Sequence, residues 1–266
     1  MAPRSRDPGS ASERRFFLAR TPEEGDPVLD PVEAGHALEV LRLKTGDRLI
    51  GLDGRGAAWT LRVSASSRGR IEVAAEGPAR REPRPGEPGA SLPWIEVALA
   101  WPKGSRAEEL VDRLTQLGAA AIAPIVAARS APGSRGISRN RLARLQRIAR
   151  EACKQCGRTW LPVLHPPRTL PDLAGGETIL LQPGAPSGLS AWARGRDPGE
   201  RWPWTAASPL RIVVGPEGGF APEEEAGLLA RGARAARLGP HALRIETAAE
   251  AGLAILAGMF VRYPRS

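Results

Sequence analysis

The sequence has 266 residues, of which 42% are hydrophobic and 25% charged, values typical of a globular protein with one large or two small domains. No apolar run approaches the roughly 18 residues of a membrane span, and residues 1–13 lack the apolar segment of a secretory signal, so we expect a disordered tail, no membrane association and a cytoplasmic location. The net charge of +9 favours an anionic partner, nucleic acid first, although the scarcity of lysine among the 38 basic residues is also what a GC-rich genome produces.

Residues 14–77 carry short strand patterns separated by turns. Four strands are expected, at residues 16–18, 47–53, 57–63 and 70–74. A short helix is expected at residues 36–43, and Asp53-Gly54 is typical of a tight turn between strands. Short strands at intervals of roughly ten residues indicate a small β-barrel. The proline-, glycine- and charge-rich residues 78–93 indicate a linker.

From Trp94 onward, strand patterns alternate with helix patterns. The expected strands span residues 94–100, 120–127, 161–164, 178–182 and 210–214. The expected helices span residues 106–117, 138–156 and 247–261. This alternation predicts a parallel sheet covered by helices, so we expect residues 94–266 to form one α/β domain. Residues 183–209, which have no clear period, are expected to form a surface loop that contains Trp192, Trp202 and Trp204.

The last expected helix is apolar on nearly every side. It carries Ala248, Ala249, Leu253, Ile255, Leu256, Met259, Phe260 and Val261. A helix without a polar face is buried, either in its own core or against another subunit. Because this helix is terminal, we expect it to lie partly between subunits.

The two cysteines, Cys153 and Cys156, lie inside the expected helix 138–156. Two thiols and three histidines that are distant in sequence do not complete a zinc site, so we expect no metal. A redox CxxC normally lies at the start of a helix, where the helix N-terminus lowers the thiol pKa. We therefore interpret both cysteines as packing residues.

Two glycine-containing segments near the C-terminus give the strongest indication of a site. The strand 210–214 leads into Gly215–Phe220 (GPEGGF), and Pro222 suits the first position of a following helix. Ligands of parallel sheets bind at the carboxyl ends of strands, where glycines let backbone N–H groups approach closely. The second segment, Leu238–Ala248, brings polar residues to another helix start. Neither GK[ST] nor GxGxxG is present, so phosphate binding is the weaker interpretation, and a purely structural turn stays open.

Five segments together resemble the RsmE family of ribosomal RNA methyltransferases, within the SPOUT superfamily. They are His36–Arg42, Lys103-Gly104, Glu151–Arg158, Gly215–Phe220 and Leu238–Ala248, and they follow the order of the family from about Arg15 to the C-terminus. The resemblance implies a PUA-like RNA-binding barrel followed by a trefoil-knotted α/β domain that binds S-adenosyl-L-methionine. It also implies a homodimer that methylates N3 of one uridine in the 16S ribosomal RNA of the small subunit.

The resemblance also implies which residues form the site. The expected cofactor contacts are Gly215, Pro216, Gly218, Gly219, Leu238, Gly239 and Leu243. Loss of the N3 proton leaves an anion on the uracil, which Arg244 is expected to stabilise or position. Glu246 and Glu217 are candidates to orient the site or accept the proton, with a bracing role at the helix start or loop as the alternative. The expected RNA contacts are Arg14, Arg15, His36, Arg42 and Arg129. The basic face of helix 138–156 is left open as a further RNA contact.

Three positions depart from the pattern of the family. Gln116 replaces a glutamate, Leu145 replaces a tryptophan, and Ala221 replaces the serine or threonine that caps a helix. The lost cap should cost about 1 kcal/mol unless it is compensated. Both glycine segments and Arg244 are retained, so we expect activity. The alternatives are a knotted methyltransferase that acts on a ribose 2′-hydroxyl, and a non-catalytic RNA-binding assembly factor.

Overall fold

The computed structural model describes residues 14–262, except residues 68, 103, 131–136 and 197–202. The expected tail at residues 1–13, Lys103 and Trp202 therefore lie outside the described residues. The chain divides into two compact units between Glu82 and Pro83, within the segment expected to be a linker. In the described part of the chain, no helix is both long and apolar enough to cross a membrane.

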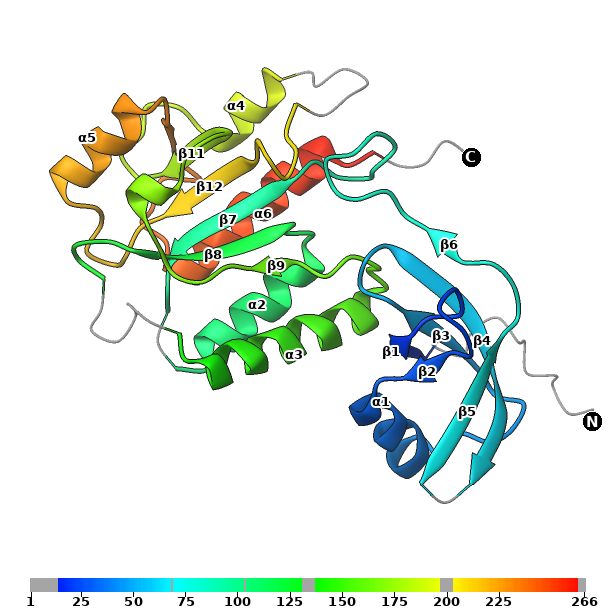
Figure 1. The fold of residues 1–266 in the computed structure, drawn as a ribbon. Coiled ribbons are helices and arrows are strands. Elements are labelled where there is room, and N and C mark those ends of the chain that lie inside the picture. Colours follow the sequence, from blue (N-terminus) through cyan, green and yellow to red (C-terminus); the bar gives the residue numbers. More distant parts are fainter. Residues whose placement is uncertain (1–13, 68, 103, 131–136, 197–202, 263–266) are drawn as a thin grey trace, which may run out of the picture. The chain divides into compact units, whose positions relative to one another are not determined.

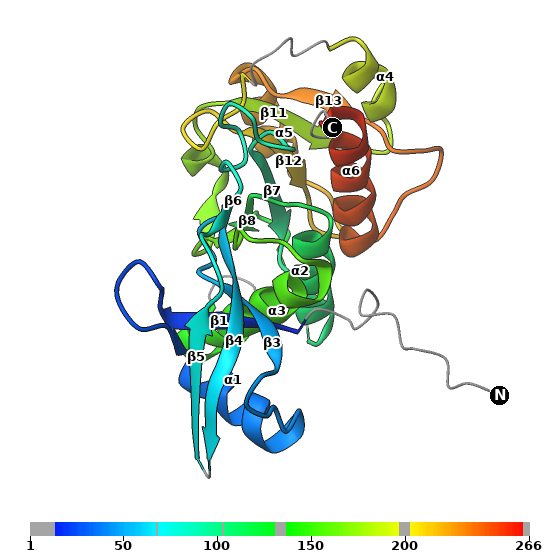
Figure 2. The ribbon, with the colours of Figure 1, turned by 90° about the vertical axis from the view of Figure 1, so that its right-hand side faces the viewer.

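The first unit is a barrel-like sheet. Its strands are β1 (Arg15–Arg20), β2 (Val28–Leu29), β3 (Arg48–Leu52), β4 (Ala57–Ser67), β5 (Arg70–Ala75) and β6 (Arg80–Arg81). They are ordered β2-β1-β3-β4-β5, with β6 paired to β4, and β1 and β3 are parallel. The long β4–β5 hairpin is visible in Figure 2. Contacts between β2 and β5 bring the two ends of the sheet together, so the predicted barrel is confirmed.

Strand β4 shows why this sheet encloses a core. Trp59, Leu61 and Val63 are buried while Thr60 and Arg62 are exposed, which is the two-residue period of a strand with one buried face. Part of the segment expected to be a linker belongs to this sheet, because residues 80–81 form strand β6 and pair with β4.

The helix expected at residues 36–43 lies further towards the N-terminus. It begins as α1 (Pro31–Gly35) and continues as a π-helical turn, η1 (His36–Val40). The Asp30 carboxylate accepts a hydrogen bond from the Val32 N–H at 3.0 Å, which caps this earlier start. Arg42, with φ of 52°, lies in the left-handed region, so the helix cannot continue to Leu43.

The second unit is built on a parallel sheet. Its strands are β7 (Ile95–Ala100), β8 (Ala121–Val126), β9 (Val163–Leu164), β10 (Arg168–Thr169), β11 (Glu177–Leu181), β12 (Leu210–Val214) and β13 (Arg234–Ala236). They are ordered β10-β8-β7-β12-β11-β13, with β9 paired to β8. The longer strands β7, β8 and β12 are almost entirely apolar and buried, as expected for a sheet covered on both faces.

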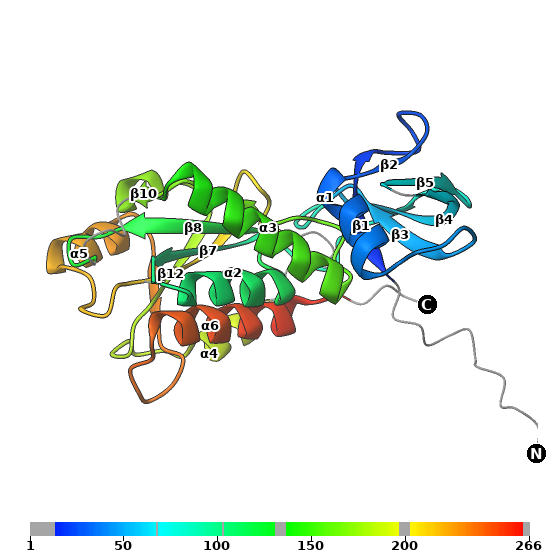
Figure 3. The same ribbon diagram turned by 90° about the horizontal axis from the view of Figure 1, so that it is seen from below.

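Helices connect these strands and cover the sheet. They are α2 (Arg106–Gln116), α3 (Arg139–Cys156), α4 (Leu189–Arg194), η2 (Leu170–Asp172), α5 (Pro222–Ala230) and α6 (Ile245–Phe260). Helix α2 lies between α3 and α6, and α6 packs on β7 and β12 (Figures 1 and 3). The α/β domain predicted from the alternation is confirmed.

The segment 183–209 is not the surface loop that was predicted. It contains α4, in which Leu189 and Ala193 are buried one helical turn apart. Trp204 is also buried, and its ring lies 4.9 Å from that of Phe260 in α6, between centroids. The prediction failed because a six-residue helix is too short to show a period, and its apolar side chains pack mainly on a distant segment.

Helix α6 is apolar around most of its surface, but only one side is covered within a single chain. Leu253 and Leu256 are buried, and Gly252 lies so close to β11 and β12 that a Cβ would be 2.8 Å from a Leu181 methyl group. On the other side, Ala254 and Met259 are exposed.

Candidate active site

A cleft of about 480 Å³ opens at one edge of the parallel sheet. Strands β12, β11 and β13 are neighbours and run in the same direction, so their carboxyl ends meet there. The end of each strand or the segment after it contributes residues to the wall: 181–184 at the end of β11, most of 214–220 at the end of β12, and part of 238–248 after β13, together with Glu225 of α5. This is where ligands of open α/β sheets bind.

The loop after β12 has a conformation that requires glycine at two positions. Gly219 has φ of 69°, in the left-handed region, and its N–H donates to the Pro216 carbonyl at 2.8 Å. A Cβ on Gly215 would lie 2.8 Å from the ring of Phe220, which folds back beneath the loop. The loop therefore turns tightly and presents backbone atoms to the cleft.

Two side chains hold this loop against the segment that follows β8. The two carboxylate oxygens of Glu224 accept hydrogen bonds from the Ala128 N–H at 2.7 Å and the Ala221 N–H at 2.9 Å. The Arg129 guanidinium donates to the Gly218 carbonyl at 2.8 Å. Ala221 has no side chain that can cap α5, but Glu224 satisfies the Ala221 N–H, as the acid of a capping box does. The cost expected from the missing cap is thus partly compensated.

Five of the expected cofactor contacts line the cleft. They are Gly215, Pro216, Gly219, Leu238 and Leu243, and the cleft is also lined by Glu217. Gly218 does not line it; an added Cβ there would instead lie 3.5 Å from the Arg129 side chain. Gly239 does not line the cleft either.

The two other expected catalytic residues lie at the start of α6. Arg244 is the N-cap residue of α6; its side chain is exposed, and its neighbours Leu243 and Ile245 line the cleft while it does not. Glu246 also lies outside the lining set. Its Oε1 atom is 3.1 Å from Arg106 Nη1, an ion pair without hydrogen-bond geometry. The arrangement of Glu246 thus corresponds to the alternative bracing role.

Several lining residues were missed by the sequence analysis. Gln182, Pro183 and Gly184 follow β11 directly, and a proline-glycine turn after an expected strand was the signal that pointed to them. Glu225 lies one turn into α5, and His241 lies within the quoted 238–248 segment. No separate feature of the sequence indicated either residue, because their proximity to the cleft depends on the order of the strands in the sheet.

The expected RNA contacts are divided between the two units. Arg14, His36 and Arg42 are exposed on the first unit, and Arg15 of β1 is half-buried there. Arg129 belongs to the second unit, where its guanidinium braces the glycine loop. The altered Gln116 is exposed and donates to Asp112 within α2 at 2.8 Å, so its substitution has a local effect in this chain.

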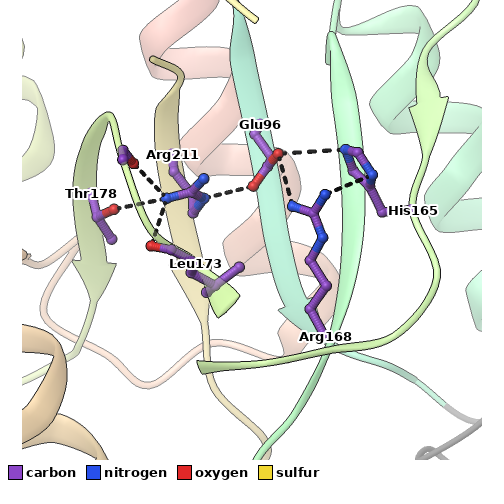
Figure 4. A network of polar contacts seen from close by, with 7 residues as sticks. Glu96, His165, Arg168, Leu173, Thr178 and Arg211 are labelled. Carbon is purple, nitrogen blue, oxygen red and sulfur yellow. Dashed lines mark hydrogen bonds and ion pairs between the residues drawn. The ribbon is translucent and has the colours of Figure 1, made fainter. Parts of the chain in front are cut away.

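A second polar cluster lies at the opposite, amino edge of the same sheet (Figure 4). Glu96 and Arg211 are direct register partners on β7 and β12, both are buried, and Arg211 Nε donates to Glu96 Oε1 at 2.6 Å. Arg211 Nη1 also donates to the carbonyls of Leu173 and Gly175 at 3.1 Å. Beside them, Arg168 Nη1 lies 3.5 Å from Glu96 Oε2.

Cys153 has the environment of a packing residue, whereas Cys156 does not. Cys153 is fully buried, and burial raises the pKa of its thiol to about 12. Its Sγ donates to the Trp160 carbonyl at 3.6 Å, while Cys156 is exposed and not disulfide-bonded. A thiol with a raised pKa is a poor nucleophile at neutral pH, which agrees with the packing interpretation for Cys153.

Comparison with known proteins decides the family. The profile of the RNA methyltransferase domain matches residues 90–257, and that of the RNA methyltransferase PUA domain matches residues 29–76. The ribosomal RNA small subunit methyltransferase E of Mycobacterium bovis is 32% identical over 262 residues, covering 94% of each chain. The chain belongs to the ribosomal RNA small subunit methyltransferase E family. The resemblance drawn from the five sequence segments is thereby confirmed.

Other members of this family extend the comparison. The enzyme of the same name from Synechocystis is 31% identical over 90% of this chain and 76% of its own. The structure of ribosomal RNA small subunit methyltransferase E from Neisseria gonorrhoeae, bound to S-adenosyl methionine, superposes with a TM-score of 0.72 at 26% identity. That comparison covers 93% of this chain and 98% of the other.

Proposed function

We propose that this protein transfers a methyl group from S-adenosyl-L-methionine to N3 of one uridine in the 16S ribosomal RNA of the small subunit. The observation that carries the proposal is the cleft at the carboxyl edge of β11, β12 and β13, with two glycine-containing loops in its wall. Membership of the ribosomal RNA small subunit methyltransferase E family supplies the target.

The cleft fits this cofactor in size and in chemistry. A volume of about 480 Å³ lies within the range of about 300–1,000 Å³ that small-molecule sites occupy. Leu181, Leu238 and Leu243 offer apolar contacts for an adenine ring, and the backbone of the glycine loop offers hydrogen-bonding groups. The carboxylates of Glu217 and Glu225 suit the positive charges of the sulfonium and the amino group. When bound, the cofactor supplies an electrophilic methyl group.

Residues in and beside the cleft have the other roles that the reaction requires: proton acceptance, stabilisation of the uracil anion and positioning. The N3 proton of uridine must leave before or during transfer, and Glu217 lines the cleft as a candidate acceptor. Arg244 is exposed between two lining residues, a position suited to a guanidinium that contacts a uridine entering from solvent and stabilises its anion. Glu246, held by Arg106, positions the start of α6.

The wider assembly is part of the same proposal. The PUA domain binds RNA through Arg14, Arg15, His36 and Arg42, and the exposed apolar side of α6 forms the homodimer contact. We place the reaction in the cytoplasm, with small ribosomal subunits as the partner. The trefoil knot implied by the family resemblance belongs to this proposal as well.

The decisive experiment measures methyl transfer from labelled S-adenosyl-L-methionine to small subunits from a strain that lacks the endogenous enzyme. We expect N3-methyluridine, identified by mass spectrometry. Removal of one guanidinium that stabilises a developing anion costs about 10²–10³-fold in rate, so Arg244→Ala should fall by that factor. The matched control is Arg234→Ala, which removes another exposed arginine of the same unit and should be unaffected.

Each alternative has its own outcome in this experiment. A ribose 2′-O-methyl product would assign the protein to a different reaction of knotted methyltransferases. A protein that binds RNA but not the cofactor would be a non-catalytic assembly factor. Equal activities of Arg244→Ala and Arg234→Ala would remove Arg244 from the proposed mechanism.

A further inference from the structure

Helix α3 has an unusually one-sided charge. Its 18 residues include six basic side chains and a single acidic one, Glu151. The basic residues are Arg139, Arg141, Arg144, Arg147, Arg150 and Lys154. The Arg144–Glu108 and Lys154–Glu151 ion pairs offset only part of this charge, so the helix carries a net positive charge.

Arginines on other elements commonly face acids. Arg48 and Arg62 share Glu76, and Arg113 pairs with Glu250. On α3, Arg144 pairs with Glu108 of α2 at 2.8 Å. Arg139 and Arg147 are both exposed, and no carboxylate of the described residues lies within ion-pairing distance of them. The whole chain has 38 basic and 29 acidic residues, whereas α3 has six basic residues and one acidic residue, so the excess of positive charge is concentrated in this helix.

Three exposed arginines of α3, Arg139, Arg144 and Arg147, lie on one face of the helix together with the half-buried Arg150. At 3.6 residues per turn, the positions of Arg139, Arg144, Arg147 and Arg150 fall within an arc of about 140°. The opposite side, which includes Leu145 and Ala149, is buried. From Arg139 to Arg150 the helix rises about 16 Å, long enough to meet several phosphates of one RNA backbone. These four residues are called the α3 basic stripe below.

The stripe begins at the edge of the sheet where the cleft opens. Helix α3 follows β8, whose carboxyl end lies on the same edge as those of β11 and β12, because all these strands are parallel. The connection after β8 touches the glycine loop through Ala128 and Arg129. A backbone lying along the stripe therefore leads towards the cleft.

We propose that the α3 basic stripe binds the phosphate backbone of the RNA substrate and delivers the neighbouring nucleotide to the cleft. The inference rests on the proposed function, because it takes RNA to be the substrate. Arginine–phosphate contacts position a nucleic acid without reading its sequence, and they supply much of its affinity. Arg129, which is expected to contact RNA, donates to the Gly218 carbonyl, and the stripe adds phosphate contacts to it.

The test compares two triple variants with equal changes in charge. The first, Arg139→Gln/Arg144→Gln/Arg147→Gln, removes most of the stripe. The control, Arg194→Gln/Arg231→Gln/Arg234→Gln, removes exposed arginines from the part of the unit around α4, α5 and β13. For each we would measure cofactor affinity by calorimetry, affinity for naked 16S RNA by filter binding at several salt concentrations, and methyl transfer to RNA and to small subunits.

For the stripe variant we expect the RNA dissociation constant and the KM for RNA to rise at least about tenfold, with kcat and cofactor affinity within about twofold of wild type. Three lost phosphate contacts should reduce the slope of log K against log salt by about 2 to 3, at roughly 0.7–0.9 per contact. The control should match wild type. A triple lysine variant at the same positions keeps the charge and should restore most of the affinity.

Two results would overturn the proposal that the α3 basic stripe binds RNA. One is an equal change in RNA affinity for the stripe variant and the control, or an unchanged salt slope. The other is a defect with intact subunits but not with naked RNA, which would assign the surface to a ribosomal protein. Failure of the proposed function would be recognised separately. A wild-type protein that binds RNA without methylating it would refute the proposed reaction, and filter binding would still show whether the α3 basic stripe binds RNA.

Discussion

The two edges of the parallel sheet in the second unit show opposite solutions to the same problem. At both edges, strand ends and their connections leave polar backbone groups that need partners. At the amino edge, Arg211 of the buried Glu96–Arg211 pair donates to two of these groups, the carbonyls of Leu173 and Gly175, and its side chain is about 3% exposed. At the carboxyl edge, glycine turns and two bracing side chains shape the loops around an open cleft.

The difference separates stability from function along one set of strands. Arg211 fixes the connection before β11 by donating to the carbonyls of Leu173 and Gly175. At the other edge, Glu224 and Arg129 hold loops by their backbone atoms and leave the cleft free of their own side chains. The amino edge therefore buries a charged pair, whereas the carboxyl edge leaves a cleft that a ligand can enter.

The largest effect should come from breaking the amino edge. Arg211→Met removes one partner of a buried ion pair and leaves the Glu96 carboxylate poorly compensated, which typically costs about 3–5 kcal/mol. We would measure the free energy of unfolding in urea at neutral pH. Arg234→Met, an exposed position on β13, is the control and should change stability little. A loss below about 1 kcal/mol for Arg211→Met would show that the pair is not what closes this edge.

A smaller effect, with consequences for the cofactor, should come from the carboxyl edge. Glu224 accepts one N–H on each of its two oxygens, whereas glutamine has one oxygen and would turn its NH₂ towards the other N–H. Because Ala128 is exposed and Ala221 half-buried, Glu224→Gln should cost about 0.5–1.5 kcal/mol, the net contribution of one hydrogen bond, and weaken cofactor binding.

Glu223→Gln is the matched control, because Glu223 is its exposed neighbour in the same helical turn. Calorimetry of cofactor binding and amide exchange at Ala128 and Ala221 are the measurements. If exchange at both amides is unchanged in Glu224→Gln, the bracing role of Glu224 is wrong.

The same two edges show what the sequence could predict. The carboxyl edge was predictable in outline, because Gly215–Phe220 directly follows a strong strand pattern and needs no information on strand order. The contribution of residues 181–184 and of His241 was not, because it depends on β11 lying between β12 and β13. Helix α4 was missed since its buried side chains pack on α6, far away in sequence.

The amino edge had a signal that was overlooked. Glu96 and Arg211 each occupy the second position of a strand that is otherwise almost wholly apolar, and their charges are opposite. A buried charge requires a partner, so two such strands of opposite charge are expected to be neighbours in register. They are, with Glu96 directly opposite Arg211. Charge complementarity in two apolar strands is therefore enough to pair β7 with β12 from the amino-acid sequence.

The smallest predicted effect concerns pH and again belongs to the amino edge. His165 Nδ1 lies 2.9 Å from Arg168 Nη2, and its Nε2 lies 3.6 Å from Glu96 Oε2. Burial, followed by the positive charge of Arg168, lowers the pKa of His165 below 6.5, while Glu96 opposes the shift. The folded protein thus keeps this imidazole neutral at a pH where the unfolded chain already binds a proton.

The sign of the resulting pH dependence follows from proton linkage. Stability from this group is fully present above about pH 6.5 and is lost as the pH falls from there through the lowered pKa of the folded state. Urea midpoints of the wild type should therefore fall between pH 7 and pH 5, and His165→Gln should flatten that fall. His241→Gln removes an exposed histidine of the same unit and serves as the control. If His165→Gln has the wild-type slope, protonation of His165 does not open the amino edge, and its carboxylates would be the groups to titrate next.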